Sequence, residues 1–306
     1  MSTNTFDTPA KLPSKTTAFD HISLSRRIKN NIAAACFAAS FLAAMVPLIW
    51  LLWVVIQRGW RAVVHAPWWT HSLRGVLPEQ YDGGIYHALY GTIAQALVAA
   101  LIAVPLGFMT AIYLVEYGNG GRMARLTTFM VDVLAGVPSI VASLFIFSLW
   151  IATLGFEQSA FAVALALVLL MLPIVVRSTE EMLRLVPDEL REASYALGIP
   201  KWKTIVRIVV PTALSGIVSG VFLAIARVMG ETAPVLVLVG ISRSINYDMF
   251  HGNMASLPLL IYSELANPQA AGEYRVWGAA LTLIIVVALA AVLAGVATRL
   301  TAVKHR

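Results

Sequence analysis

Long apolar runs alternate along this chain with short polar stretches that hold most of its charged residues. A helix rises 1.5 Å per residue, so about 20 residues are needed to cross the hydrocarbon core of a bilayer. Runs of this length predict an all-α membrane protein with about six transmembrane helices. The six predicted spans cover residues 32–57, 88–115, 127–150, 159–177, 205–240 and 276–299.

The fifth run, 205–240, is too long for a single crossing of the bilayer. We expect its first part, up to Pro211, to approach the membrane from the cytoplasm or along its surface. We expect the part after Gly230 to be irregular. The crossing itself then lies between these two residues.

Lysine and arginine residues are distributed unevenly between the two sets of connecting segments. If the N-terminus is inside, 16 of the 22 fall in inner segments and 5 in outer segments, and Arg227 lies within a span. Inner loops of membrane proteins carry this excess of positive charge. We therefore expect both termini to be cytoplasmic. Trp50, Trp53 and Trp60 near the outer end of the first span fit an interfacial aromatic belt.

The composition supports a membrane protein and argues against other classes. Hydrophobic residues make up 59% of the chain and charged residues 12%, about half the charged share of soluble domains. The net charge of +6 is explained by the topology signal, so it does not indicate nucleic-acid binding. The single cysteine, Cys36, cannot form an internal disulfide, and no Cys or His cluster predicts a metal site. We expect residues 1–30 and 301–306 to be cytoplasmic tails, and 31–87 to hold the first transmembrane helix and an outer loop.

The inner loop 178–211 is the most informative segment of the chain. Pro187 and Asp188 begin a short helix, with Asp188 expected at the N-cap, and Gly198 suits a left-handed position at its end. Leu190, Ala193, Ser194 and Leu197 recur at helical spacing, which predicts a small apolar face flanked by Arg191 and Glu192. Periodicity alone leaves two interpretations open: a connector helix on the membrane surface, or a docking element for a cytoplasmic partner.

The residue order in this loop resembles the EAA loop of bacterial ABC importer permeases. Glu192-Ala193-Ser194 is followed after three residues by Gly198, then after nine by Ile208, and then by Pro211. Ser194 and Val210 depart from the family's Ala and Leu. The resemblance implies a type I ABC importer permease fold over residues 88–300, with the short helix as the coupling helix that docks on an ATPase. By this resemblance, the coupling contact is formed by Leu190, Glu192, Ala193, Ser194, Leu197 and Gly198.

The chain has no nucleotide-binding motif of its own, because the phosphate-binding sequence Gly-x-x-x-x-Gly-Lys-Ser/Thr is absent from it. A coupling helix without such a motif implies that ATP is bound and hydrolysed by a separate partner subunit. We therefore expect that the chain is not itself an enzyme and carries no cofactor.

Arg227 and Glu231 are four residues apart inside the fifth apolar run, so they share one face of a predicted helix. A charge at bilayer depth costs about 2.5–3.5 kcal/mol and should face protein or a water-filled path. One interpretation is an internal ion pair that holds helices together. The other is that Arg227 contacts an anion in a transport pathway, because the guanidinium fork suits phosphate.

Four segments resemble the permeases of the high-affinity phosphate importer. They are Arg227 with Gly230-Glu231-Thr232-Ala233-Pro234, the block from Gly91-Thr92 through 104–107 to 111–117, Gly136-Val137-Pro138-Ser139, and the outer-loop block 255–262. In this family a permease pairs with a second, PstC-like permease. Two copies of a PstB-like ATPase bind inside, and a PstS-like phosphate-binding protein docks outside. The resemblance implies a multi-pass bacterial cell-membrane subunit with Arg227, Glu231, Thr232 and Arg177 along the substrate pathway.

Three alternatives remain open at this stage. An importer permease for sulfate or molybdate has the same coupling loop. A secondary transporter driven by an ion gradient needs no ATPase. A membrane-embedded enzyme is disfavoured, because the sequence shows no nucleophile–base or metal-ligand set.

Overall fold

A computed structural model describes residues 24–301, which form helices and loops without a β-strand. The expected tails at 1–23 and 302–306 lie outside the described residues. The α-helices are α1 (Leu24–Val63), α2 (Ala66–Thr70), α3 (Tyr86–Ile112), α4 (Arg122–Gly136), α5 (Ser139–Ile146), α6 (Ala160–Arg184), α7 (Asp188–Ala196), α8 (Lys201–Thr204), α9 (Val210–Val228), α10 (Ala233–Leu238), α11 (Leu257–Glu264) and α12 (Ala270–Thr301). Three π-helical segments accompany them: η1 (Tyr113–Tyr117), η2 (Phe147–Thr153) and η3 (Ile205–Val209).

The prediction of an all-α chain with about six spans is confirmed. Within residues 24–301, five helices are long and apolar enough to cross a membrane, and a bent helix pair brings the number to six. The structure begins the first of these helices at Leu24, so residues 24–30, which we expected in the N-terminal tail, are helical.

The third predicted span, 127–150, is a bent helix pair rather than one straight helix. α4 and α5 are bent by 104° at a break beside Pro138. Proline has no backbone N–H to donate and pushes the residue before it into an extended conformation. Val137 is accordingly extended, with ψ 125°, and α4 stops there.

The fifth run, 205–240, is continuous in its first part and broken near its end. α9 ends at Val228, and a break precedes α10, which confirms the irregular segment near Gly230. Before Pro211, however, α8 and η3 continue into α9 as one 28-residue candidate span from Lys201. That this first part approaches the membrane from the cytoplasm or along its surface stays a prediction.

Contacts divide the chain into two units, residues 1–54 and 55–306, which we describe separately. In the first unit, residues 24–54 form one uninterrupted helix with Pro47 inside it. Its apolar side chains are exposed; Phe37, for example, is 76% exposed. Such a surface requires lipid or another chain around it.

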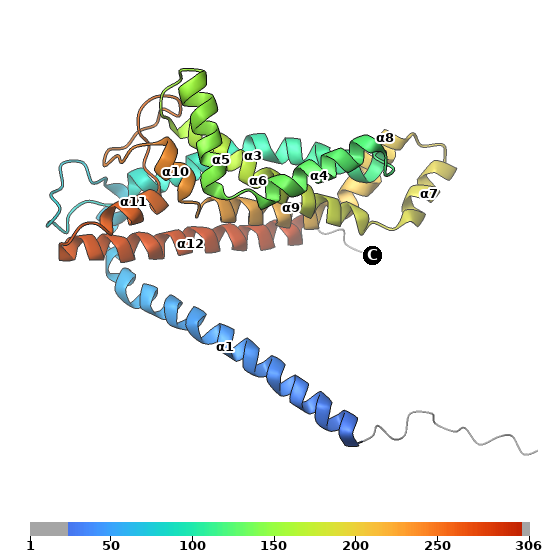
Figure 1. The fold of residues 1–306 in the computed structure, drawn as a ribbon, viewed down its shortest axis with the longest axis horizontal. Coiled ribbons are helices and arrows are strands. Elements are labelled where there is room, and N and C mark those ends of the chain that lie inside the picture. The colour runs from blue at the N-terminus through green and yellow to red at the C-terminus, as the bar shows by residue number, and fades with distance from the viewer. Residues whose placement is uncertain (1–23, 302–306) are drawn as a thin grey trace, which may run out of the picture. The chain divides into compact units, whose positions relative to one another are not determined.

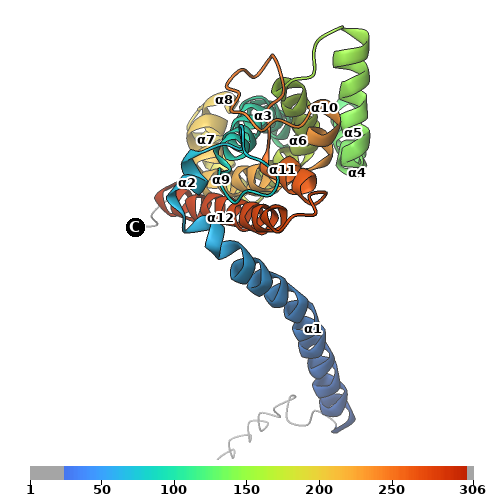
Figure 2. The same cartoon turned by 90° about the vertical axis from the view of Figure 1, so that its left-hand side faces the viewer.

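In the second unit, α6 is the central helix. It packs against α3 on one side and α9 on the other, and α12 lies along α9 (Figures 1 and 2). The facing surfaces include many small residues, which allow helix backbones to approach closely in a membrane. The alanines at the centre of this core are Ala96, Ala99, Ala103, Ala162, Ala164, Ala166 and Ala224.

Two glycines mark the closest approaches to α6. A Cβ at Gly107 of α3 would lie 2.8 Å from Val175 Cγ1, and a Cβ at Gly220 of α9 would lie 2.4 Å from Ser178 Oγ. Side chains at these positions would push the three helices apart. α3, α6 and α9 are therefore held together as one packed layer.

The segment before α11 is fixed to α3 by a similarly close contact. A Cβ at Gly91 would lie 1.9 Å from the backbone oxygen of Ala255, so a larger residue does not fit. The next residue, Thr92, accepts a hydrogen bond from the Leu257 backbone N–H at 2.8 Å. Two blocks that carried the family resemblance thus contact each other.

We predict that Gly107→Val destabilises the folded chain by about 1–3 kcal/mol, because overpacking at a close helix contact forces the backbones apart. Gly295→Val in α12 is the matched control, since nothing lies within 4 Å of a Cβ there. Thermal unfolding of the detergent-solubilised protein measures both. Equal unfolding temperatures for the two variants would contradict the close packing of α3 on α6.

Candidate functional site

The helix α7 stands in the connection between α6 and α9, as the coupling-helix prediction requires. Gly198 has φ +74°, which confirms the predicted left-handed position after the helix. The Gly198 N–H donates to the Tyr195 carbonyl at 2.9 Å, and the Ile199 N–H donates to the Ser194 carbonyl at 3.2 Å. These paired bonds form a Schellman motif that ends the helix sharply.

The start of α7 differs from the prediction. Pro187 occupies the N-cap position and Asp188 is the first helical residue, so Asp188 does not cap the helix. Its carboxylate accepts a hydrogen bond from Arg191 Nη1 at 2.9 Å instead. An acidic residue in the first turn still suits the positive end of the helix dipole.

One face of α7 is open to solvent. Leu190 is 41% exposed and Leu197 78% exposed, and Glu192 and Ala193 are also exposed. Ser194 does not share this face: it is 2% exposed, and its hydroxyl lies 2.7 Å from the Thr204 hydroxyl of α8. Ser194 therefore does not belong to the exposed apolar face predicted from spacing. Its hydroxyl contact connects α7 to α8 instead.

Arg191 points into the protein, although the sequence suggested that it flanks the exposed face. Its side chain is 12% exposed and forms a salt bridge of 3.0 Å with Glu116, which is 3% exposed. It also donates to the backbone oxygens of Val186 at 2.7 Å and Leu183 at 3.0 Å. One side chain thus joins α7 to the end of α6 and to η1, which continues α3.

A second contact reinforces the same junction. Lys201, the first residue of α8, donates through Nζ to the backbone oxygen of Glu116. Its ammonium lies 5.0 Å from the centroid of the Tyr117 ring, which is a cation–π distance. Both ends of the α7–α8 segment are therefore tied to η1. Sequence reasoning missed Glu116 and Lys201 because their partners are 75 or more positions away.

Arg227 and Glu231 are brought together, but not on one helix. α9 ends at Val228, so Glu231 lies in the break before α10, and Arg227 Nε is 4.0 Å from Glu231 Oε1. The Arg227 side chain is 65% exposed and that of Glu231 20% exposed. The pair is long and the Arg227 side chain is exposed. It is therefore not an internal ion pair that holds helices together, which was one of the two interpretations. Thr232, also in the break, is half-buried and makes no capping bond.

Arg177 lies in the interior of α6, which continues to Arg184, seven residues beyond the predicted end of the span. Its guanidinium pairs with Asp132 of α4 and donates to Glu180 Oε2 at 2.8 Å. Arg184 Nη2 reaches the other oxygen of Glu180 at 2.6 Å. Arg177 therefore belongs to an ion-pair network between α4 and α6, separate from the pair formed by Arg227 and Glu231.

Residues 103–302 match the family model described as "Binding-protein-dependent transport system inner membrane component". The chain belongs to this family. It is an inner-membrane permease subunit of an ABC importer, a membrane component without catalytic activity of its own.

Curated relatives are similar in sequence to this permease along nearly its whole length. It is 72% identical to Phosphate transport system permease protein PstA 1 of Mycobacterium tuberculosis (strain CDC 1551 / Oshkosh), over 98% of this chain and 99% of the relative. Identity to Phosphate transport system permease protein PstA of Mycobacterium leprae is also 72%, over 94% and 93% of the two chains. The Yersinia pestis protein of that name is 38% identical, over 89% and 90%.

Solved structures confirm the type I ABC importer permease fold. A chain of a bacterial alginate ABC transporter superposes with a TM-score of 0.64 at 12% identity, over 91% of this permease and 98% of that chain. A chain of the MetNI methionine ABC transporter in an inward-facing conformation gives 0.56 at 17% identity, over 72% and 95%. At these identities the likeness concerns the fold alone.

We predict that Arg191→Gln loosens the α6–α9 connection, because it leaves the buried Glu116 carboxylate without its counter-charge. Removing one partner of a buried ion pair costs about 3–5 kcal/mol, so local opening should increase by on the order of a hundredfold or more. Chymotrypsin cleavage after Tyr195 measures this opening in solubilised protein.

Asp188→Asn is the matched control, because Asp188 also pairs with Arg191 but is 86% exposed. It should leave the cleavage rate close to that of the parent chain. If Asp188→Asn accelerates cleavage as much as Arg191→Gln does, the pair with Glu116 is not the contact that holds α7.

Proposed function

We propose that this permease is the PstA-type subunit of an ATP-driven importer of inorganic phosphate. The observation that carries the proposal is the 72% identity, over 98% of the chain, to a permease named for phosphate transport. In the proposed assembly it forms the pathway with a second permease. Two copies of a separate ATPase bind ATP on the cytoplasmic side, and a phosphate-binding protein docks outside. Both termini and α7 then lie in the cytoplasm.

The proposed coupling element is the exposed face of α7. Leu190, Ala193 and Leu197 offer a small apolar surface with Glu192 beside it, as a helix that docks in a groove requires. The Schellman turn at Gly198 and the prolines on both sides fix the helix ends. A rigid, sharply bounded helix transmits displacement better than a frayed one. These features support a contact with the ATPase through this face.

Motion at α7 has two routes into the membrane. The first is covalent, through α6 and through α8 into α9. The second is the Arg191–Glu116 salt bridge at 3.0 Å, which connects α7 to η1 and hence to α3. Because α3, α6 and α9 pack through small residues, displacement of one must move the others. In the proposed cycle, ATP binding and hydrolysis drive this layer between outward-open and inward-open arrangements.

The proposed contact with phosphate is made by Arg227. Its guanidinium is 65% exposed in the single chain, although α9 is a candidate membrane span. A cation at membrane depth must face protein or water, and pairing with a second permease would enclose it beside a pathway. Glu231 at 4.0 Å is too distant to satisfy the five donors of Arg227, so the fork stays available to an anion.

Arg177 takes a secondary place in this proposal. Its guanidinium is already engaged by the two carboxylates of Asp132 and Glu180. A passing phosphate would have to compete with both carboxylates for the same donors. The pairing instead favours a role in holding α4 against α6 during transport.

We predict that Glu192→Lys lowers phosphate uptake by at least about tenfold, because reversing a charge at a docking surface places like charges together or breaks a pair. The protein should still insert in the membrane, since Glu192 is exposed. Uptake of radiolabelled phosphate and co-purification of the ATPase measure the effect in cells that lack their own copy of the permease. Glu157→Lys, an exposed acidic residue outside the α7 segment, is the control. Parental uptake in the Glu192 variant would remove the coupling role from this face.

We predict that Arg227→Ala lowers phosphate uptake by about 10–100-fold while the ATPase still co-purifies, because charge-assisted hydrogen bonds to the anion are lost. Phosphate uptake by Arg227→Lys should fall between that of the parent chain and that of Arg227→Ala, since lysine retains the charge but not the planar fork. Arg299→Ala, an exposed arginine near the end of α12, is the matched control. Uptake at the parental rate in Arg227→Ala would show that this guanidinium does not contact the substrate.

A further inference from the structure

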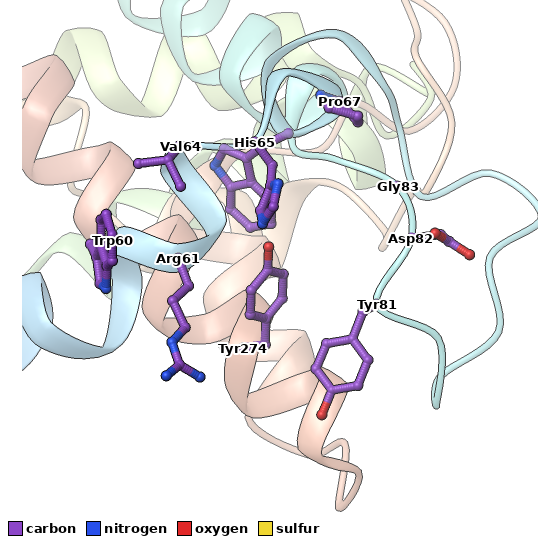
Figure 3. Close-up of a pocket in the computed structure, with 10 residues that line it drawn as sticks. Trp60, Arg61, Val64, His65, Pro67, Tyr81, Asp82, Gly83 and Tyr274 are labelled. Atoms are coloured by element: carbon purple, nitrogen blue, oxygen red, sulfur yellow. The ribbon is translucent and has the colours of Figure 1, made fainter.

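A cavity of about 680 Å³ lies at the end of the helical unit opposite α7, between the end of α1, α2, the loop at 81–83 and the start of α12 (Figures 1 and 3). All of its lining residues belong to the second unit. Since α1 ends and α12 begins here, the cavity lies at the ends of two candidate membrane spans. It is remote in sequence from the coupling helix and from Arg227.

Aromatic side chains form much of the wall. Tyr274 meets Trp68 edge-to-face at 5.9 Å between ring centroids, and Tyr81 at 5.5 Å. The Trp68 indole N–H is already used, because it donates to Thr282 at 3.0 Å. The hydroxyls of Tyr274 and Tyr81 have no hydrogen-bond partner among the contacts found in residues 24–301. Figure 3 shows these two hydroxyls pointing in opposite directions, so the rings rather than a pair of converging donors form this wall.

Arg61 lines the same space and also lacks a partner in the described part of the chain. Figure 3 shows its guanidinium pointing away from His65 and from the Tyr274 hydroxyl, to the side on which the Tyr81 hydroxyl also lies. Arg58, one turn earlier on α1, provides a contrast: it pairs with Glu273 at 2.7 Å and lies 5.1 Å over the Trp277 ring. Asp82 also lines the cavity, but Figure 3 shows its side chain pointing away from Arg61. A permanent cation with free donors is suited to an anion with several acceptor oxygens.

An exposed apolar stripe leads from the candidate span of α1 to the cavity. Ile56, Trp60 and Val64 recur every four residues and are 50%, 53% and 61% exposed. Trp60 and Val64 also line the cavity. An apolar surface therefore extends from the candidate span of α1 to Arg61.

From these observations we infer that the cavity binds a membrane phospholipid, with the phosphodiester at Arg61, the rest of the headgroup against the aromatic wall, and an acyl chain along Ile56, Trp60 and Val64. Inorganic phosphate offers the same oxygen acceptors. Inorganic phosphate would leave the apolar stripe and much of the aromatic wall uncovered. A single arginine also provides too little positive charge to balance a dianion. Aromatic residues with a basic residue at the end of a span are also typical of headgroup contacts.

The test is photo-crosslinking of the full chain, with its co-purifying subunits, in phosphatidylcholine vesicles that contain a photoactivatable phosphatidylglycerol. Crosslinks should map to the loop at 81–83 and to the start of α12, and unlabelled phosphatidylglycerol should displace them. Arg61→Gln should reduce this labelling by about tenfold, the effect of losing charge-assisted hydrogen bonds. Tyr274→Phe, which keeps the ring and its packing, should label like the parent chain, because the Tyr274 hydroxyl points away from Arg61.

Arg74→Gln is the matched control, because Arg74 is exposed in the neighbouring loop but does not line the cavity. It should label like the parent chain. Labelling that neither saturates nor responds to Arg61→Gln would mean ordinary surrounding lipid and would overturn the inference. Displacement by millimolar inorganic phosphate but not by unlabelled lipid would overturn it in favour of a free anion. Normal labelling outside the cavity in each variant verifies that the protein is folded.

Discussion

The salt bridge between Arg191 and Glu116 is the contact on which the proposed mechanism depends most. Both side chains are almost completely removed from solvent, so neither charge can be left alone without a large cost. The pair, together with the carbonyls that Arg191 also binds, fixes where α7 stands relative to α3 and α6. An exposed docking helix transmits force only if its inner side is held firmly. In this chain that inner side is held by Arg191, Ser194 and Lys201.

Packing by small residues supplies the other half of the mechanism. Lipid tails are as apolar as leucine, so helices in a membrane associate through close contact rather than through the exclusion of water. The glycines at 91, 107 and 220 let α3 reach the segment before α11, and let α3 and α9 reach α6. A layer packed this closely has little freedom to deform locally. Movement applied at α7 would therefore displace the layer as a body, as an alternating-access cycle requires.

Sequence alone predicted the membrane class, most of the spans and the end of α7, because these depend on local hydrophobicity and on glycine and proline chemistry. The bend at Pro138 could not be singled out, because proline is tolerated within many membrane helices, including α3 and α6 of this chain. The inward orientation of Arg191 and Ser194 was missed for a different reason. Their partners, Glu116 and Thr204, come from other segments, and no local pattern contains them. The family resemblance located α7 and the segment around Arg227 but could not say which side of each faces outward.

The arginines of this chain differ in whether their guanidinium groups have carboxylate partners within the described residues. Arg275, with 2% of its side chain exposed, pairs with Glu264 at 3.1 Å and binds the Leu77 carbonyl. Arg177 and Arg191 likewise have carboxylate partners within the chain. Arg227 has a single carboxylate at the limit of pairing distance, and Arg61 lines a cavity with its donors unused. Both arginines lie on or at the end of candidate membrane spans, where an unsatisfied cation is costly. The physical expectation is that an anion from outside the chain completes each of them, a transported one at Arg227 and a resident lipid headgroup at Arg61.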